Sequence, residues 1–220
     1  MKTQMKLAIF FATFIVLAVL TPVHSAHAVK YSKASVKSDM PLPQLLSYAA
    51  GDINKFWLLN FNSSRRRYIQ PSLIYYTQPI RTPCGVAVMN NAFYCAAANT
   101  IYYDYNFINN MYSNVGDYAA VSIIAHEWGH LVQAQLGVGQ GLSIQMELQA
   151  DCLAGAYTQY AKIARELEEG DMEEAGVGLF NAGDPRGMPW FAAQAHGKPM
   201  DRISAFLDGY KGGVRVCFSR

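Results

Sequence analysis

Two histidines four residues apart, His126 and His130, are the side chains in this sequence best suited to hold a metal ion. With Glu127 they form the pattern H-E-x-x-H in a segment of helical periodicity, so both imidazoles project from one face of a helix. Zinc accepts nitrogen and oxygen ligands tetrahedrally, and a hydrolytic zinc site keeps its fourth position for water. The pattern therefore predicts one Zn²⁺ ion, with Glu127 as the base that activates its water.

A third ligand is needed, and Glu147 is the best candidate because it lies on a second predicted helix beyond a glycine-rich turn. An antiparallel pair of helices would return this carboxylate to the histidines. Asp151 follows one turn later on the same face, where it can accept the outer N–H of a zinc-bound histidine and fix its tautomer. Carboxylates with this spacing are usually solvated, but the flanking residues are apolar, and an unpaired buried carboxylate is costly.

His196 is a further candidate for the chemistry. Gly197 and Pro199 place it in a loop after the predicted helices, where it can donate a hydrogen bond to a developing oxyanion. A surface or packing histidine is an equally good interpretation.

The elements that must position these residues change in character after about residue 116. Residues 73–107 are rich in Tyr, Ile, Val and Thr and broken by Pro, Gly and Asn, which predicts several short strands. Asp117 can cap a helix that stops at Gly137, and Ser143 can cap a second helix that runs towards Glu169. We therefore predict an α+β domain with strands first and helices after.

Two further helices are expected before the C-terminus. Asp171 with Glu174 resembles a capping box that opens a third helix, and a last short helix is predicted over residues 201–207. Residues 181–189 contain enough Gly and Pro to form a loop between them.

The N-terminus has the layout of a signal peptide over residues 1–28. Lysines precede an uncharged apolar run over residues 7–20, and small residues follow up to Ala28, after which we expect cleavage. A flexible arm over residues 29–44 and a folded domain over residues 45–220 would follow. The alternative is an uncleaved membrane anchor, but the run is short for a membrane span. The sequence thus predicts a secreted or periplasmic protein without stable membrane association.

The charge balance gives no reason to expect a polyanionic partner. The chain has 18 basic and 16 acidic residues, and loss of the two lysines in the signal peptide would make the two numbers equal. The dense basic run over residues 65–67 is typical of a solvated loop or strand edge. We therefore expect no binding to nucleic acid.

The cysteines are even in number and follow the predicted export signal, which favours disulfides over thiols. Cys84 and Cys95 flank Asn90 and Asn91, a pair suited to a tight hairpin turn that would bring the two thiols together. The remaining pair is then Cys152 with Cys217. Zinc binding by cysteine is disfavoured because no C-x-x-C pair is present.

Several blocks of the sequence resemble the putative neutral zinc metallopeptidases of bacteria, a family with a zincin-type metal site. The resemblance extends over residues 53–213 and implies a zincin-like α+β domain, in which a small N-terminal sheet precedes a helical part with His126, His130 and Glu147 as metal ligands. The chain departs from the family's pattern at residues 96–99, where a proline and an acid are missing. The blocks are HEWGHLVQ at His126, ELQADCLAG at Glu147, CG at Cys84, FYC at Phe93, IYYD at Ile101 and HGKPMDR at His196.

The expected activity is that of a zinc metallopeptidase. Zinc would activate a water and polarise the scissile carbonyl, while Glu127 takes the proton and passes it to the leaving amine. The substrate would be a peptide or protein, which can bind as an added strand along the edge of the predicted sheet. The alternative is a zinc-containing binding or scaffold protein of the cell envelope, although a structural zinc would not require Glu127.

Overall fold

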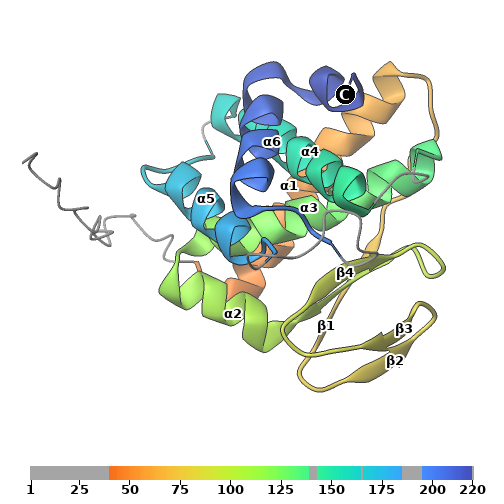
Figure 1. The fold of residues 1–220 in the computed structure, drawn as a ribbon. Helices are drawn as coiled ribbons and strands as arrows, with labels where there is room; N and C mark the ends of the chain where they lie inside the picture. The colour runs from red at the N-terminus through yellow and green to blue at the C-terminus, as the bar shows by residue number, and fades with distance from the viewer. Residues whose placement is uncertain (1–39, 139–142, 165, 185–194, 220) are drawn as a thin grey trace, which may run out of the picture. The chain divides into compact units, whose positions relative to one another are not determined.

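The computed structural model describes residues 40–138, 143–164, 166–184 and 195–219. The expected signal peptide and the expected arm up to residue 39 lie outside these ranges. The α+β expectation is confirmed, since strands precede most of the helices (Figure 1). The elements are α1 (Leu42–Ser63), β1 (Ser72–Tyr76), β2 (Ile80–Thr82), β3 (Gly85–Ala87), β4 (Ala92–Cys95), β5 (Thr100–Asp104), α2 (Tyr105–Asn114), α3 (Asp117–Leu136), α4 (Ser143–Ile163), α5 (Asp171–Asn181), α6 (Pro199–Gly212) and the 3₁₀ helix η1 (Val214–Phe218).

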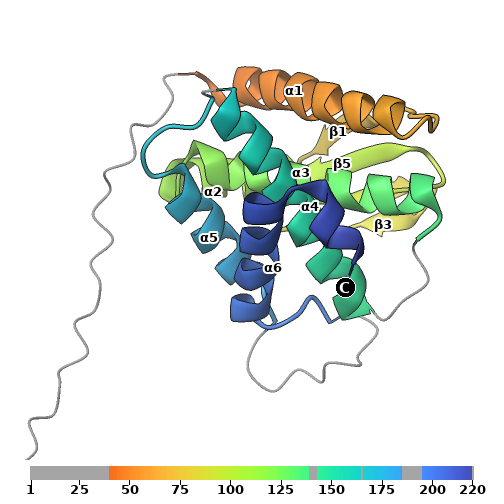
Figure 2. The same cartoon turned by 90° about the horizontal axis from the view of Figure 1, so that it is seen from above.

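Helix α1 was not among the expected elements. It begins at Leu42, three residues before the expected start of the folded domain, and Leu42 itself is buried. Its buried side chains recur at helical spacing, with Leu46, Ile53 and Trp57 almost fully enclosed. Figure 2 shows the helix alongside the sheet, and its apolar face shares a core with Ile101 of β5. No helix in the described ranges is long and apolar enough to cross a membrane.

The main sheet has three strands in the order β1-β5-β4. Strand β5 pairs in parallel with β1 and antiparallel with β4, so β4 is an edge strand. Every residue of β5 is buried because both of its faces are covered. Ile101 and Tyr103 pack into the core shared with the helices, whereas Tyr102 packs with the residues near the β2–β3 hairpin. Tyr105, expected to continue the strand, instead begins α2.

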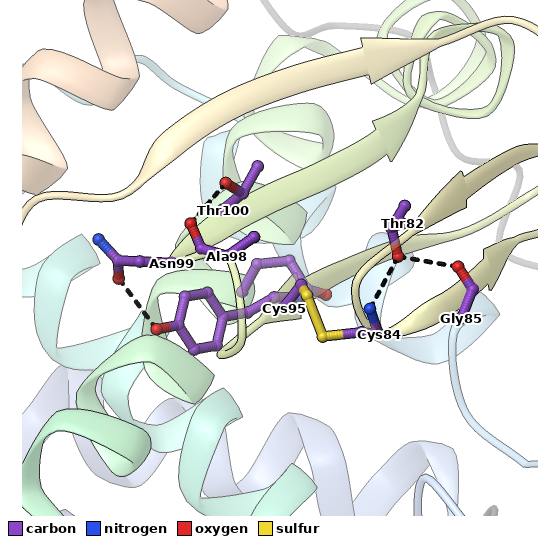
Figure 3. The surroundings of a disulfide bond; sticks show 9 residues. Thr82, Cys84, Gly85, Cys95, Ala98, Asn99 and Thr100 are labelled. Carbon is purple, nitrogen blue, oxygen red and sulfur yellow. Dashed lines mark hydrogen bonds between the residues drawn. A yellow bond between two sulfur atoms is a disulfide. The ribbon is translucent and has the colours of Figure 1, made fainter.

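Both predicted disulfides are present, Cys84 with Cys95 (Figure 3) and Cys152 with Cys217. The reason given for the first pairing was wrong. Residues 90 and 91 do not form a hairpin turn, because β3 pairs with β2 and β4 pairs with β5. Instead, these two asparagines connect the two sheets, and the first disulfide links the β2–β3 turn to the end of β4.

Helix α3 ends as predicted, with Gly137 in the left-handed region at a φ of 68°. Its start is capped differently. Asp117 is the first helical residue rather than the N-cap, which is Gly116, and the backbone N–H of Tyr118 donates to Glu174 of α5 over 2.8 Å. A Cβ atom on Gly116 would overlap the Glu174 carboxyl group, so glycine is needed there. Glu174 therefore caps a neighbouring helix.

The later helices differ in length from the expectation. Helix α4 ends at Ile163, six residues before the predicted end, and α6 covers residues 199–212 rather than 201–207. The third predicted helix is present as α5, but its N-cap is Gly170, and Asp171, the cap of the predicted capping box, is its first helical residue. Residues 139–142, which contain two of the three glycines of the predicted turn between α3 and α4, lie outside the described ranges.

Helices α4 and α6 cross with their backbones in close contact. A Cβ atom on Gly155 would lie 1.9 Å from the carbonyl oxygen of Phe206, and one on Gly209 would lie 1.8 Å from that of Cys152. The disulfide between Cys152 and Cys217 ties the same part of α4 to η1, directly after α6. The glycines and the disulfide together hold α6 against α4.

We expect Gly209→Ala to lower the free energy of unfolding by about 3 kcal/mol or more, because the new methyl group would force the two helices apart. Gly51→Ala is the matched control, since a Cβ atom at this position on α1 meets nothing within 4 Å. It should be neutral or stabilise the protein by up to ~1 kcal/mol. Denaturant titrations of both variants measure the difference, and equal stabilities would contradict the described crossing.

Three acidic side chains, Asp117, Asp171 and Glu174, are buried together where α3 and α5 begin, with carboxylate oxygens within 4.8 Å of one another. Burial raises the pKa of the Asp171 carboxyl to about 7. The hydrogen bond from the N–H of Glu168 opposes this shift, and the charges of Asp117, Glu174 and Glu168 add to it. Because the folded pKa lies above the ordinary value, Asp171 stabilises the fold at acidic pH, and this contribution is lost as the pH rises through about 7.

We therefore expect Asp171→Asn to stabilise the metal-free protein more at pH 8 than at pH 5, relative to the unmodified chain. The amide keeps an acceptor for the N–H of Glu168 but removes the charge. Glu173→Gln, an exposed change in the same turn of α5, is the control and should show no such pH dependence. Urea unfolding at the two pH values tests this, and identical behaviour of the two variants would contradict it.

Candidate metal centre

The two histidines of the H-E-x-x-H pattern lie on one face of α3, with their Nε2 atoms 3.1 Å apart. Helix α4 runs antiparallel beside α3, as expected. The two helices approach closely at Gly129, where a Cβ atom would lie 2.8 Å from the Cα atom of Ala150. The glycine inside the pattern thus lets α4 bring its carboxylates to the histidines.

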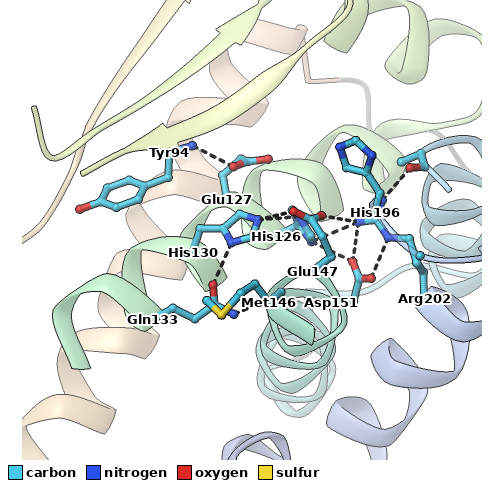
Figure 4. Close-up of polar contacts among 12 residues, drawn as sticks. Tyr94, His126, Glu127, His130, Gln133, Met146, Glu147, Asp151, His196 and Arg202 are labelled. Atoms are coloured by element: carbon cyan, nitrogen blue, oxygen red, sulfur yellow. Dashed lines mark hydrogen bonds and ion pairs between the residues drawn. The ribbon is translucent and has the colours of Figure 1, made fainter. Parts of the chain in front are cut away.

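Glu147 of α4 faces both histidines, as Figure 4 shows. Its Oε2 atom lies 3.3 Å from Nε2 of His126, and its Oε1 atom lies 3.3 Å from Nε2 of His130. Ligands bound tetrahedrally at the usual zinc distances lie about 3.3 Å from one another. The identity and the spacing of the three donor groups therefore fit a zinc ion.

The outer nitrogen of each imidazole is held by a different side chain. Nδ1 of His126 lies 2.8 Å from Oδ1 of Asp151, as the sequence predicted for this carboxylate. Nδ1 of His130 lies 2.8 Å from Oε1 of Gln133, whose amide nitrogen donates to the carbonyl oxygen of Met146. These contacts direct both Nε2 atoms towards the shared position beside Glu147.

Gln133 and Arg202 are two site residues that the sequence did not predict. Gln133 is almost completely buried one turn after His130. A polar residue on the apolar side of a predicted helix could have indicated its place in the site. Arg202 of α6 is also buried and forms two hydrogen bonds of 2.8 Å with Asp151, one to each carboxylate oxygen. It ends the HGKPMDR block, but nothing local indicated its partner.

The charges of the ligands reinforce one another. Burial opposes protonation of His126, but the neighbouring carboxylates of Asp151 and Glu147 outweigh it and raise its pKa to about 10. The pKa of His130 is also raised against the effect of burial, through its contact with Glu147. Conversely, the two histidines hold the pKa of Glu147 below its ordinary value despite burial. A cation that binds the imidazoles must displace their protons, so binding would release protons.

Glu127 lies beside the predicted ligands and is buried. Its Oε2 atom accepts a 2.9 Å hydrogen bond from the backbone N–H of Tyr94 in edge strand β4. The glutamate, the three predicted ligands and part of β4 line one cavity of about 540 Å³. A substrate group in this cavity would therefore meet the metal position and Glu127 together.

His196 lines the same cavity but stands apart from the ligands, and 55% of its side chain is exposed. Its ring Nδ1 atom lies 3.4 Å from Oδ1 of Asp184. The same carboxylate accepts hydrogen bonds from the backbone N–H groups of His196 and Gly197. Asp184 thus shapes the loop that presents the histidine to the cavity.

A family model described as putative neutral zinc metallopeptidase matches residues 9–217 of the chain. The chain belongs to this family. The geometry described above lies wholly within the matched residues, and the zinc in the family's name agrees with the donor set of His126, His130 and Glu147.

The names of two similar proteins state no function. The chain is 34% identical to the uncharacterized protein YpfJ of Escherichia coli (strain K12), with 71% of this chain and 63% of that protein covered. It is 29% identical to the uncharacterized protein Rv2575 of Mycobacterium tuberculosis (strain H37Rv), with 68% and 62% covered. The chain thus spans less than two thirds of the length of these relatives. No solved structure matches it.

We expect Glu147→Ala to weaken zinc binding more than Asp151→Asn does, because the first removes a ligand and the second only loosens a histidine. The second change should cost about 10- to 100-fold in affinity. Competition between a chelator and the metal-free protein for zinc gives the dissociation constant of each variant. Glu173→Ala, at an exposed position, is the control. Unchanged zinc affinity in Glu147→Ala would remove this residue from the site.

Proposed function

We propose that this protein is a zinc-dependent peptidase that acts outside the cytoplasm. The observation that carries the proposal is the position of Glu127 beside three donor groups, whose nearest atoms lie 3.1–3.3 Å apart, a spacing that fits zinc. A site that held zinc only for stability would be closed by a fourth protein ligand. Here the predicted ligands instead line a cavity that a carboxylate shares.

Glu127 would act as the general base. When bound, zinc would lower the pKa of a water molecule and polarise the scissile carbonyl group. The N–H of Tyr94 holds Oε2 of Glu127 in place, so the carboxylate is oriented before substrate arrives. Glu127 would take the proton from the water and deliver it to the leaving amine, which needs no other acid.

Substrate would bind along β4. Within the described sheet this strand is an edge, and the N–H of Tyr94 points away from β5 towards Glu127. A peptide laid antiparallel or parallel to this edge would gain main-chain hydrogen bonds and place one carbonyl group in the cavity. This arrangement supports peptides and unfolded proteins as the substrate class.

His196 would stabilise the oxyanion. It reaches the cavity from the side of α6, where its Nδ1 atom lies 3.4 Å from Oδ1 of Asp184. A ring that carries a proton on Nε2 can donate a hydrogen bond to a developing negative charge. Its exposure leaves room for the ring to adjust to a bound substrate.

The proposed location rests on the cysteines and on the expected signal peptide. All four cysteines are paired, and disulfides persist in the periplasm and outside the cell rather than in a reducing cytoplasm. The signal peptide itself lies outside the described residues.

Glu127→Gln tests the activity. We expect it to retain zinc and to lose hydrolysis of an unfolded protein or a peptide library by about 10²- to 10⁴-fold, because only the base is removed. Glu173→Gln, an exposed change, should hydrolyse as the unmodified chain does. If the zinc-loaded, unmodified protein cleaves nothing in the library, the scaffold alternative replaces the peptidase.

A further inference from the structure

The arginine of α6 has more contacts in the metal centre than its ion pair with Asp151. Its Nη2 atom lies 3.3 Å from Nδ1 of His126 and 3.8 Å from Oε2 of Glu147. Its Nη1 atom donates to the carbonyl oxygen of Ala182, at the end of α5 and on the wall of the cavity. Only 3% of Arg202 is exposed, and Asp151 is fully buried.

We propose that Arg202 is a positioning residue of the metal centre, which holds Asp151 in the one orientation that directs Nε2 of His126 at the ion. This inference rests on the proposed zinc site but not on peptidase activity.

The two hydrogen bonds from Arg202 restrict Asp151 to one orientation. Nε of Arg202 donates to Oδ2 of Asp151, and Nη2 donates to Oδ1, each over 2.8 Å. Oδ1 is also the atom that faces Nδ1 of His126. A guanidinium group that donates to both oxygens fixes the plane of the carboxylate, whereas a single hydrogen bond would leave it free to rotate. Rotation of Asp151 would break both of these bonds and the contact with His126 together.

The charge of Arg202 also favours this role. Its guanidinium group lies 2.8 Å from Asp151 and 3.8 Å from Glu147, so its positive charge adds to that of a divalent ion beside these acidic side chains. Since an uncompensated buried charge is costly, loss of this arginine would leave Asp151 without its buried charge partner.

The fold also fixes the position of the arginine. The close crossing at Gly155 and Gly209 and the disulfide from Cys152, the residue after Asp151, hold α6 on α4. Arg202 lies one turn inside α6, so its head group reaches Asp151 from a fixed backbone. The bond to Ala182 adds α5, and one side chain thus connects three helices around the metal position.

Cobalt binding to the metal-free protein tests the proposal, because Co²⁺ accepts the same donors and its visible absorption reports ligand geometry. Arg202→Met, which keeps much of the length but removes charge and donors, should weaken cobalt binding by about 10- to 100-fold and alter the spectrum. Arg202→Lys keeps the charge but lacks the planar guanidinium group, so its cobalt affinity should lie between those of Arg202→Met and the unmodified protein. Arg215→Met, at an exposed arginine just after α6, should change neither property.

Combination with Asp151→Asn separates positioning from simple packing. If Arg202 acts through Asp151, the double variant should lose less affinity than the two single losses multiplied together. A lower melting temperature with unchanged cobalt affinity and spectrum in Arg202→Met would mean a packing role only and would overturn the proposal. If Arg202→Met does not fold, the same criterion applies to Arg202→Lys.

The unmodified protein separates failure of this proposal from failure of the proposed function. If it binds no cobalt, or if Glu147→Ala binds cobalt equally well, the metal site itself is wrong. Normal cobalt binding without peptide cleavage contradicts only the peptidase proposal.

Discussion

The contact between His126 and Asp151, 2.8 Å long and enclosed by three helices, is the interaction on which the metal centre depends. An imidazole can offer a metal either of its nitrogens and can rotate about its bond to Cβ. Asp151 removes both freedoms, because it engages Nδ1 and leaves Nε2 to face His130 and Glu147. Three features keep His126 and Asp151 buried at that distance. They are the close approach of α3 and α4, the arginine on α6, and the glycines that let α6 reach α4.

Local spacing was enough to predict the central part of the site. A separation of four residues places two histidines on the same face of any α-helix, and a glycine-rich turn makes an antiparallel return the simplest path. Glu147 and Asp151 therefore lie where the sequence predicted. Helix α1 was missed although its apolar residues recur at helical spacing, so that omission was avoidable.

Contacts between distant segments were not predictable in the same way. Glu174 has the sequence position of a capping-box residue, yet it caps α3 because α5 packs with its first turn against the start of that helix. The two asparagines at positions 90 and 91 have the residue types of a hairpin turn, but β3 pairs with β2, and β4 pairs with β5. Arg202 is 51 residues from Asp151, and no periodicity or motif joins them.

The two disulfides end next to the two residues that orient the chemistry. Cys95 directly follows Tyr94, whose N–H holds Glu127, and Cys152 directly follows Asp151. Before its thiols are oxidised, a newly made chain would hold these two residues without their covalent ties. Reduction of either disulfide would therefore loosen a residue that orients the site as well as the fold around it.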